Sequence, residues 1–146
     1  MEIDGEFSSK MPLSVVHDLI GDLNEVSKCL PGIEEITEQE GRLRCSVRLD
    51  ISEFKTGYLS TLSGKLYVSK TEGQNRISIH TEGRIAGSKI EIDVVLNLRD
   101  LGEITNVAWH SDIRIGILAK MLGEEAVNSF IRKTVDQVIG CLRGKI

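Results

Sequence analysis

The sequence predicts an α+β fold in which a curved antiparallel sheet of seven strands wraps around one long C-terminal helix, with two short helices after the first strand. Between residues 33 and 115, apolar and polar side chains alternate in successive runs that short turn sequences separate. After Gly116 the apolar period changes to 3.6 residues and continues to about Leu142. The length of 146 residues suits a single domain over residues 1–146.

The first part of the chain is expected to form one strand and two short helices. Residues 3–7 alternate between apolar or small and acidic side chains, which gives a strand with one apolar face. Pro12 can form the first turn of a helix over "PLSVVHDLI", which Gly21 ends. A second helix, "DLNEVSKC", begins with Asp22 as its N-cap and ends before Pro31, because a residue that precedes proline disfavours the helical conformation.

The joint Pro31–Gly32 connects the second helix to the second strand. Proline ends the helix, and glycine can adopt backbone angles that other residues avoid, so the chain can turn within two residues. The segment from Gly21 to Gly32 has a glycine at each end. We therefore expect it to be a lid that exchanges its amide hydrogens faster than the long helix does.

Six further strands are expected after this joint, the first of them from Ile33. In "RLRCSVRLDI" every second residue is apolar or Cys45, a regularity typical of a strand. The later strands are expected at residues 58–71, 75–84, 88–100 and 104–115. The sequences between them, "EGQN", "GRIAGS" and "DLGE", contain the turn residues that antiparallel hairpins require.

The C-terminal helix is expected to cover the apolar face of the sheet. Its stripe consists of Leu122, Val127, Phe130, Ile131, Thr134, Val138 and Leu142. A helix of about 25 residues spans roughly 37 Å, enough to cross the sheet. A strongly twisted sheet of this size curls, and a curled sheet around a straight helix leaves a gap. We therefore expect an internal cavity, although a filled core would produce the same alternation.

The residues expected to bind a ligand in this cavity are apolar positions on the inner strand faces and on the helix, together with one threonine. They are Leu62, Leu66, Val68, Ile77, Ile79, Ile92, Val94, Leu96, Val107, Trp109, Val127, Phe130, Ile131 and Thr134. Trp109, the one tryptophan of the chain, falls on the apolar face of its strand.

Composition argues against several classes of protein. Eighteen basic and 22 acidic residues give a net charge of −4, aromatic residues make up 4%, and no basic block exists, so nucleic-acid binding is not expected. The N-terminus lacks the apolar core of a signal peptide, and "IGILAKML" is too short to span a membrane. Cys29, Cys45 and Cys141 are odd in number and lack CxxC spacing, so neither a disulfide framework nor a zinc site is expected, and a reducing cytoplasm fits best.

No catalytic residue, metal ligand or cofactor-binding motif emerges. His17, His80 and His110 fall on different elements without a cysteine or carboxylate at ligand or triad spacing. His110 and Asp112 would share an outward strand face, where a solvated pair is favoured over a functional one. Cys29 is interpreted as a small buried residue in preference to a reactive thiol. GxSxG, HExxH, GxGxxG and P-loop motifs do not occur.

Several motifs along nearly the whole chain resemble the carbon monoxide dehydrogenase G-subunit family, which belongs to the START-related (SRPBCC) helix-grip superfamily. The stretch "CLPG" joins the second helix to the second strand, and Gly64 lies within the fourth strand. Gly83 and Gly87 follow, and "NVAWHSDIRIGILAKMLG" spans the junction of the last strand and the helix. The matching order and spacing of Trp109, Asp112, Gly116, Leu118, Ala119, Leu122 and Gly123 make the resemblance more specific.

This resemblance implies a helix-grip fold, an elongated apolar cavity and a non-catalytic accessory role beside a molybdenum-containing dehydrogenase. Family members are thought to carry a lipid or quinone, or to bring the enzyme to the membrane. One alternative is a docking adaptor with a solid core and no ligand. A cyclase or hydrolase of the same superfamily is another, and it would need a polar cluster inside the cavity.

Two departures from the family pattern affect these expectations. The chain has "EFKTGYL" where the family often has a valine-glycine-proline-like joint between its third and fourth strands. Some relatives also continue beyond the last helix into a tail with an apolar anchor, whereas this sequence ends at Ile146. At most, therefore, a peripheral contact with a membrane is expected.

Overall fold

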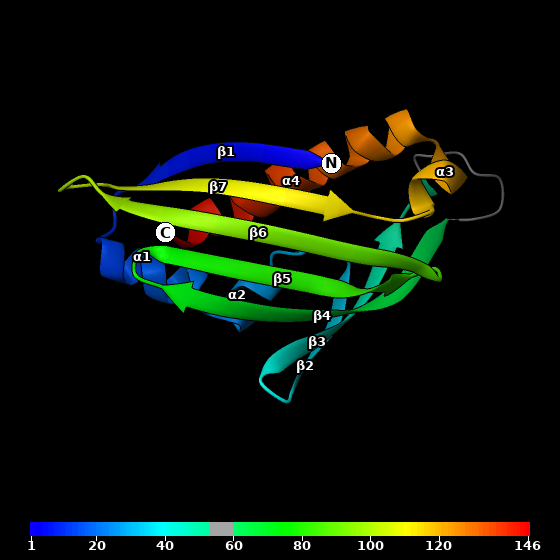
Figure 1. The fold of residues 1–146 in the computed structure, drawn as a ribbon, viewed down its shortest axis with the longest axis horizontal. Coiled ribbons are helices and arrows are strands. Elements are labelled where there is room, and N and C mark those ends of the chain that lie inside the picture. The colour runs from blue at the N-terminus through cyan, green and yellow to red at the C-terminus, as the bar shows by residue number, and fades with distance from the viewer. Residues whose placement is uncertain (53–59) are drawn as a thin grey trace.

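The computed structural model describes residues 1–52 and 60–146, which form one antiparallel sheet with helices on its concave side (Figure 1). The strands are β1 (Glu2–Ser9), β2 (Ile33–Gln39), β3 (Arg42–Asp50), β4 (Thr61–Gly73), β5 (Arg76–Ile85), β6 (Ser88–Asp100) and β7 (Thr105–Arg114). Their order in the sheet is β1-β7-β6-β5-β4-β3-β2. The predicted fold class is confirmed, while the first two residues of the strand expected at 58–71 lie outside the described residues.

Local signals position the first two helices, α1 (Leu13–Ile20) and α2 (Leu23–Ser27). The Asp22 carboxylate accepts hydrogen bonds from the backbone N–H groups of Asn24 and Glu25 at 3.1 and 3.4 Å, which confirms the predicted N-cap. Gly32 has φ +69°, and a Cβ there would lie 2.3 Å from the carbonyl oxygen of Arg48. The Pro31–Gly32 joint therefore requires glycine both for its backbone angle and for its close approach to β3.

The prediction of a single helix after Gly116 is wrong, because two helices occupy this region. They are α3 (Leu118–Leu122) and α4 (Glu124–Lys145). Gly123, between them, has φ 93° and ψ 123°, which no α-helix contains. The 22 residues of α4 span roughly 33 Å at about 1.5 Å per residue, still enough to cross the sheet. None of the described helices combines the length and the apolar character needed to cross a lipid bilayer.

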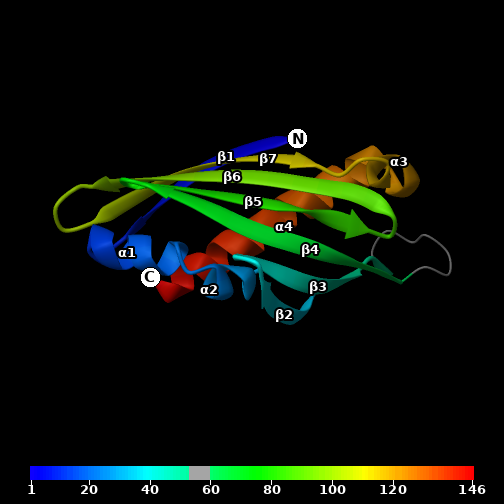
Figure 2. The same ribbon diagram turned by 60° about the horizontal axis from the view of Figure 1, so that its bottom comes forward.

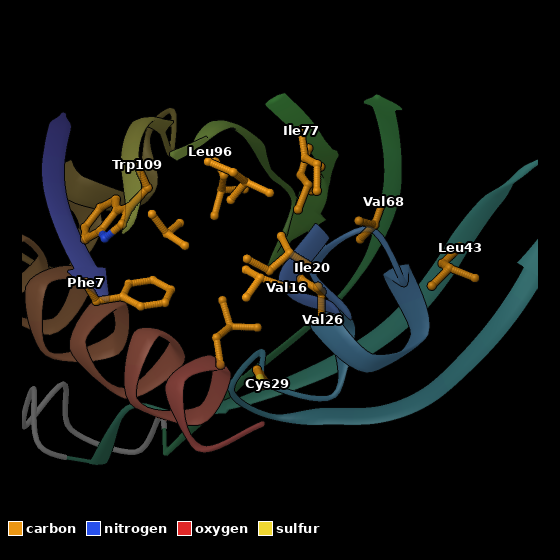
Figure 3. Packing of buried hydrophobic residues seen from close by; sticks show 14 of the residues in the cluster. Phe7, Val16, Ile20, Val26, Cys29, Leu43, Val68, Ile77, Leu96 and Trp109 are labelled. Carbon is orange, nitrogen blue, oxygen red and sulfur yellow. The ribbon is translucent and has the colours of Figure 1, made fainter. Parts of the chain in front are cut away.

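The sheet curls around α4, with α1 and α2 near one end of that helix and α3 at the other (Figure 2). Near the first end the core is closely packed. Figure 3 shows Leu96 and Ile77 directed from the sheet toward the side where α1 contributes Val16 and Ile20, and the Trp109 indole beside β1 near Phe7. A second buried cluster, near α3, contains Leu118 and apolar residues of β3 to β6. The helices thus meet the sheet at its two ends.

The cysteines correct the sequence prediction, because Cys29 and Cys141 form a disulfide. Their Cα atoms are 5.6 Å apart although 112 residues separate them along the chain. Sequence spacing carries no sign of this pair, since only the tertiary fold brings the last turns of α4 to the α2–β2 joint. Cys45 is a free, buried thiol whose pKa is raised by burial. The disulfide removes the cysteine-based reason for expecting a reducing compartment.

Candidate functional site: an apolar cavity

A cavity of about 250 Å³ lies between the inner face of the sheet and helix α4. Strands β3 to β7 form its roof, α4 forms its floor, and residues of the α1–α2 region and of α3 close its ends. A water molecule occupies roughly 30 Å³ in the liquid, so this volume has room for about eight ligand groups of that size. The cavity is slightly smaller than ligand pockets usually are, at roughly 300 to 1,000 Å³.

The partial exposure of some inner strand residues shows where the cavity lies. Ile90 and Leu96 on β6 are buried against neighbouring elements, whereas Ile92 and Val94 between them are only half-buried although they face α4. An apolar residue on the inner face of a sheet remains accessible in this way where opposing side chains do not reach it. On α4, the lining residues Phe130 and Ile131 are likewise half-buried.

All residues predicted for the site line the cavity except Ile77 and Val107. The placement of these two needs correction. Both are fully buried in the packed cluster that contains Val16 and Ile20 of α1, so α1 fills the space beside them. The binding role of the remaining residues stays a prediction.

The structure adds lining residues that the predicted site did not contain. Val47 and Leu49 of β3 belong to the roof, and Val26, Leu30 and Pro31 close one end. The alternation of β3 could have identified the first two, since it is as regular as that of β6. The α2–β2 residues carry no such signal, because contacts between residues distant in sequence, the Cys29–Cys141 disulfide among them, bring them against α4.

Within residues 1–52 and 60–146, no titratable side chain lines the cavity. Its polar residues are Ser27, Thr81, Ser111 and Thr134, and the Ser111 hydroxyl already donates to the carbonyl oxygen of Ile3 at 3.1 Å. General acid–base catalysis uses side chains that exchange protons, and zinc sites use Cys, His or carboxylate ligands. The cavity offers instead an environment that favours uncharged, apolar molecules, because an unpaired charge is costly to bury.

Helix α3 closes the end of the cavity opposite to α2. Leu118 and Leu122 line the cavity, whereas Ile117 and Met121 are 60% and 56% exposed. Gly116 and Gly123 flank this helix with φ 60° and 93°. Among the described residues, this end wall thus contains a short helix that is apolar toward the cavity and partly apolar toward solvent.

The histidines of β5 and β7 lie on the opposite, outer face of the sheet. His80 contacts the carboxylates of Asp93 at 2.6 Å and Glu82 at 3.2 Å. His110 pairs with Asp4 and Glu2 of β1, so the expected His110–Asp112 pair is not formed. Most of these carboxylates lie on the strand next to the histidine that they contact, and Glu82 lies on the same strand. Spacing along the chain therefore did not reveal most of them.

Three of these outer residues could in principle hold a metal ion. His80, Glu91 and Asp93 place their ligand atoms within 4.8 Å of one another. Both carboxylates, however, already contact the guanidinium of Arg114, at 3.2 and 2.7 Å. We therefore interpret the group as a surface ion-pair network, separated from the cavity by the sheet.

This ion-pair network changes the pKa of His80. The hydrogen bond to Asp93 raises the pKa of His80 above its ordinary value of 6.5, partial burial opposes the rise, and Glu82 adds to it. Protonated His80 therefore adds stability that is fully present below the pKa of the unfolded chain and is lost as the pH rises through the folded pKa. In an NMR titration of the imidazole, Asp93→Asn should lower the pKa of His80, and Asp112→Asn should change it little. Equal effects of the two substitutions would refute the assignment.

A curled antiparallel sheet over one long helix with an apolar cavity between them defines the START-related, or helix-grip, class of proteins. The chain belongs to the carbon monoxide dehydrogenase G-subunit (CoxG) family, whose model matches residues 5–146. No curated protein matches the chain significantly.

Solved structures show the same fold at low sequence identity. A conserved protein from Geobacillus kaustophilus is similar with a TM-score of 0.80 and 13% identity, covering 99% of this chain and 94% of its own. A START superfamily protein from Mycobacterium smegmatis has a TM-score of 0.68 and 14% identity over 99% and 96% of the two chains. The Zhui aromatase/cyclase from Streptomyces sp. R1128 has a TM-score of 0.66 and 9% identity over 99% and 92%. Since an aromatase/cyclase shares the fold, the fold itself does not decide between binding and catalysis.

Proposed function

We propose that this protein is a non-catalytic carrier of an uncharged lipophilic molecule, a lipid or a quinone, that serves a molybdenum-containing dehydrogenase. The observation that carries the proposal is a cavity whose lining, in the part of the chain that the structure describes, is apolar apart from four hydroxyl-bearing residues and has no titratable side chain. Membership of the CoxG family supports the link to a dehydrogenase. A solid docking adaptor is less consistent with about 250 Å³ of internal space. A cyclase would need a polar cluster inside the cavity, whereas the polar groups of the described lining are four hydroxyls.

The magnitudes suit a carrier that must release its cargo. Burial of about eight methylene-sized groups contributes roughly 6 kcal/mol at about 0.8 kcal/mol each. Association costs on the order of 4 to 15 kcal/mol, so a ligand confined to the cavity binds weakly. A ligand with a longer tail would gain affinity by extending past α3, where the exposed Ile117 and Met121 provide further apolar surface.

Helix α3 also offers a route for exchange with a membrane. Its outward Ile117 and Met121 could contact the surface of a bilayer while Leu118 and Leu122 of the same helix line the cavity. Such a contact would be peripheral and would bring the end of the cavity to the source of the ligand. Recruitment of a dehydrogenase to the membrane would follow from the same contact.

The carrier function is tested by filling the cavity. The probe is N-phenyl-1-naphthylamine, an uncharged fluorophore whose emission increases in apolar surroundings. Val94→Trp places an indole inside the cavity, whereas Val95→Trp places it on the outer face of the same strand, and both valines are half-buried. We expect Val94→Trp to weaken probe binding at least about tenfold, as a steric block should, and Val95→Trp to leave it nearly unchanged.

Thermal unfolding of both variants must show that they remain folded at the assay temperature. Undiminished binding to a folded Val94→Trp protein would exclude the cavity as the site. Native mass spectrometry of protein gently extracted from its own host should then identify a bound lipid or quinone. A pull-down from the same extract should recover the dehydrogenase.

A further inference from the structure

We propose that the Cys29–Cys141 disulfide is a redox latch on the cavity. While it is intact, the segment Gly21–Gly32 is held against α4 and a bound ligand is retained. When a dithiol reduces it, the segment can move away from α4 and ligand exchange becomes faster. The proposal concerns regulation of the cavity and depends on the proposed carrier function for its ligand.

The disulfide joins two facing walls of the cavity. Val26, Leu30 and Pro31, around Cys29, line one wall. Val138 and Leu142, on either side of Cys141, line the other. The label of Cys29 in Figure 3 lies beside the last turns of α4. Separation of the two sulfur atoms would therefore free one wall of the cavity from the other at this end.

A polar contact between these two walls, an ion pair, is weak. Lys145 Nζ and Glu25 Oε2 form an ion pair at 2.9 Å, with side chains that are 27% and 33% exposed. Ion pairs with this exposure contribute little to stability and are screened by salt. Among residues 1–52 and 60–146, no backbone hydrogen bond joins residues 22–32 to α4. The disulfide is thus the strongest single connection between the segment and the helix.

The ends of the segment are attached to the sheet independently of α4. Lys70 Nζ of β4 donates a hydrogen bond to the carbonyl oxygen of Gly21. At the other end, the backbone N–H of Arg48 on β3 donates to the carbonyl oxygen of Gly32 at 2.8 Å. Between these attachments, the described residues form no strand pairing with the sheet. Release of the middle therefore permits local opening without loss of the sheet, the kind of sub-global motion that hydrogen exchange detects.

The reaction is a two-electron thiol–disulfide exchange. A thiolate of the dithiol attacks one sulfur atom of the disulfide, which forms a mixed disulfide and releases the other cysteine as a thiolate. The second thiolate of the reductant then attacks the reductant's own sulfur atom in the mixed disulfide and releases the remaining cysteine. Cys29 and Cys141 end as two thiols, and the reductant ends as a cyclic disulfide. Reoxidation by a disulfide of higher potential reverses the exchange and closes the latch.

The experiment measures two quantities in the oxidised and the dithiothreitol-reduced full chain. One is the dissociation rate of N-phenyl-1-naphthylamine in stopped flow, and the other is amide hydrogen exchange over residues 22–32. The double variant Cys29→Ser/Cys141→Ser should behave like reduced wild type and should not respond to dithiothreitol. Cys45→Ala, which retains the disulfide, should respond as wild type does, and serves as the matched control.

We expect reduction to increase both the dissociation rate and the exchange of residues 22–32 at least about tenfold, while strands β4 to β7 stay protected. Unchanged exchange in this segment would overturn the latch. Loss of protection throughout the sheet would also overturn it, because the latch requires a folded reduced state. If the probe binds in neither redox state, the carrier function fails, and the exchange measurement alone decides on the latch.

Discussion

Gly83→Ala is expected to destabilise the protein by about 3 to 5 kcal/mol, at the upper end of what single substitutions do. Gly83 of β5 is paired with Leu66 of β4. A Cβ at Gly83 would lie 2.0 Å from the carbonyl oxygen of Lys65 and 2.9 Å from the Cα of Leu66. Both are backbone atoms, so the clash can be relieved only if the two strands move apart.

The same close approach occurs at Gly64, where a Cβ would lie 2.1 Å from the carbonyl oxygen of Arg84. Gly64 and Gly83 both fall on the inner face of the sheet, in alternation with lining residues such as Leu62 and Thr81. Two glycines on the concave side allow β4 and β5 to approach closely where the sheet bends. The curvature that creates the cavity therefore depends on the absence of side chains at these positions.

Gly73→Ala is the matched control, since Gly73 is also in β4 but a Cβ there would meet its nearest atoms at 3.8 and 3.9 Å, an ordinary contact. Urea unfolding of the two variants should give a large loss of unfolding free energy for Gly83→Ala and less than about 1 kcal/mol for Gly73→Ala. Equal losses would show that the close approach of β4 and β5 does not limit stability.

Local sequence signals were sufficient for most of the fold. The cap at Asp22, the Pro31–Gly32 joint and the alternation over 88–100 each act through residues next to one another in the chain, and the structure places β6 at Ser88–Asp100 as predicted. The break at Gly123 was missed because apolar residues continue at helical spacing on both sides of it. The following pair Glu124–Glu125, acidic residues at a helix start, was the available signal.

The remaining errors concern contacts that depend on the tertiary fold. Cys29 meets Cys141, and His110 meets Asp4, only after strands and helices distant in sequence have come together. Whether the inner face is packed or hollow depends on the summed volume of side chains from the sheet and from α4, which alternation does not contain. Sequence therefore identified 12 of the 32 described residues that line the cavity, while the cavity itself and the placement of Ile77 and Val107 required the structure.

The pairing of Gly5 with Trp109 across β1 and β7 carries the second large effect. A Cβ at Gly5 would lie 2.4 Å from Cζ2 of the indole, and Trp109 also lines the cavity. Gly5→Ala should therefore displace the indole, which can move only toward the cavity or strain its own strand. We expect a loss of about 2 to 3 kcal/mol in unfolding free energy. Binding of N-phenyl-1-naphthylamine should weaken about tenfold, because the displaced ring occupies part of the site.

A double-mutant cycle separates this contact from a general effect of alanine in β1. Trp109→Leu removes the ring atoms that the new Cβ would meet, at its own cost of about 2 to 4 kcal/mol for lost burial. In the Trp109→Leu background, Gly5→Ala should cost less than about 1 kcal/mol, and the difference measures the coupling of the two positions. The same cost in both backgrounds would refute the contact. If the contact is real, the absence of a side chain at Gly5 lets the indole lie against the sheet and so keeps the cavity open. The first strand then contributes to the proposed function.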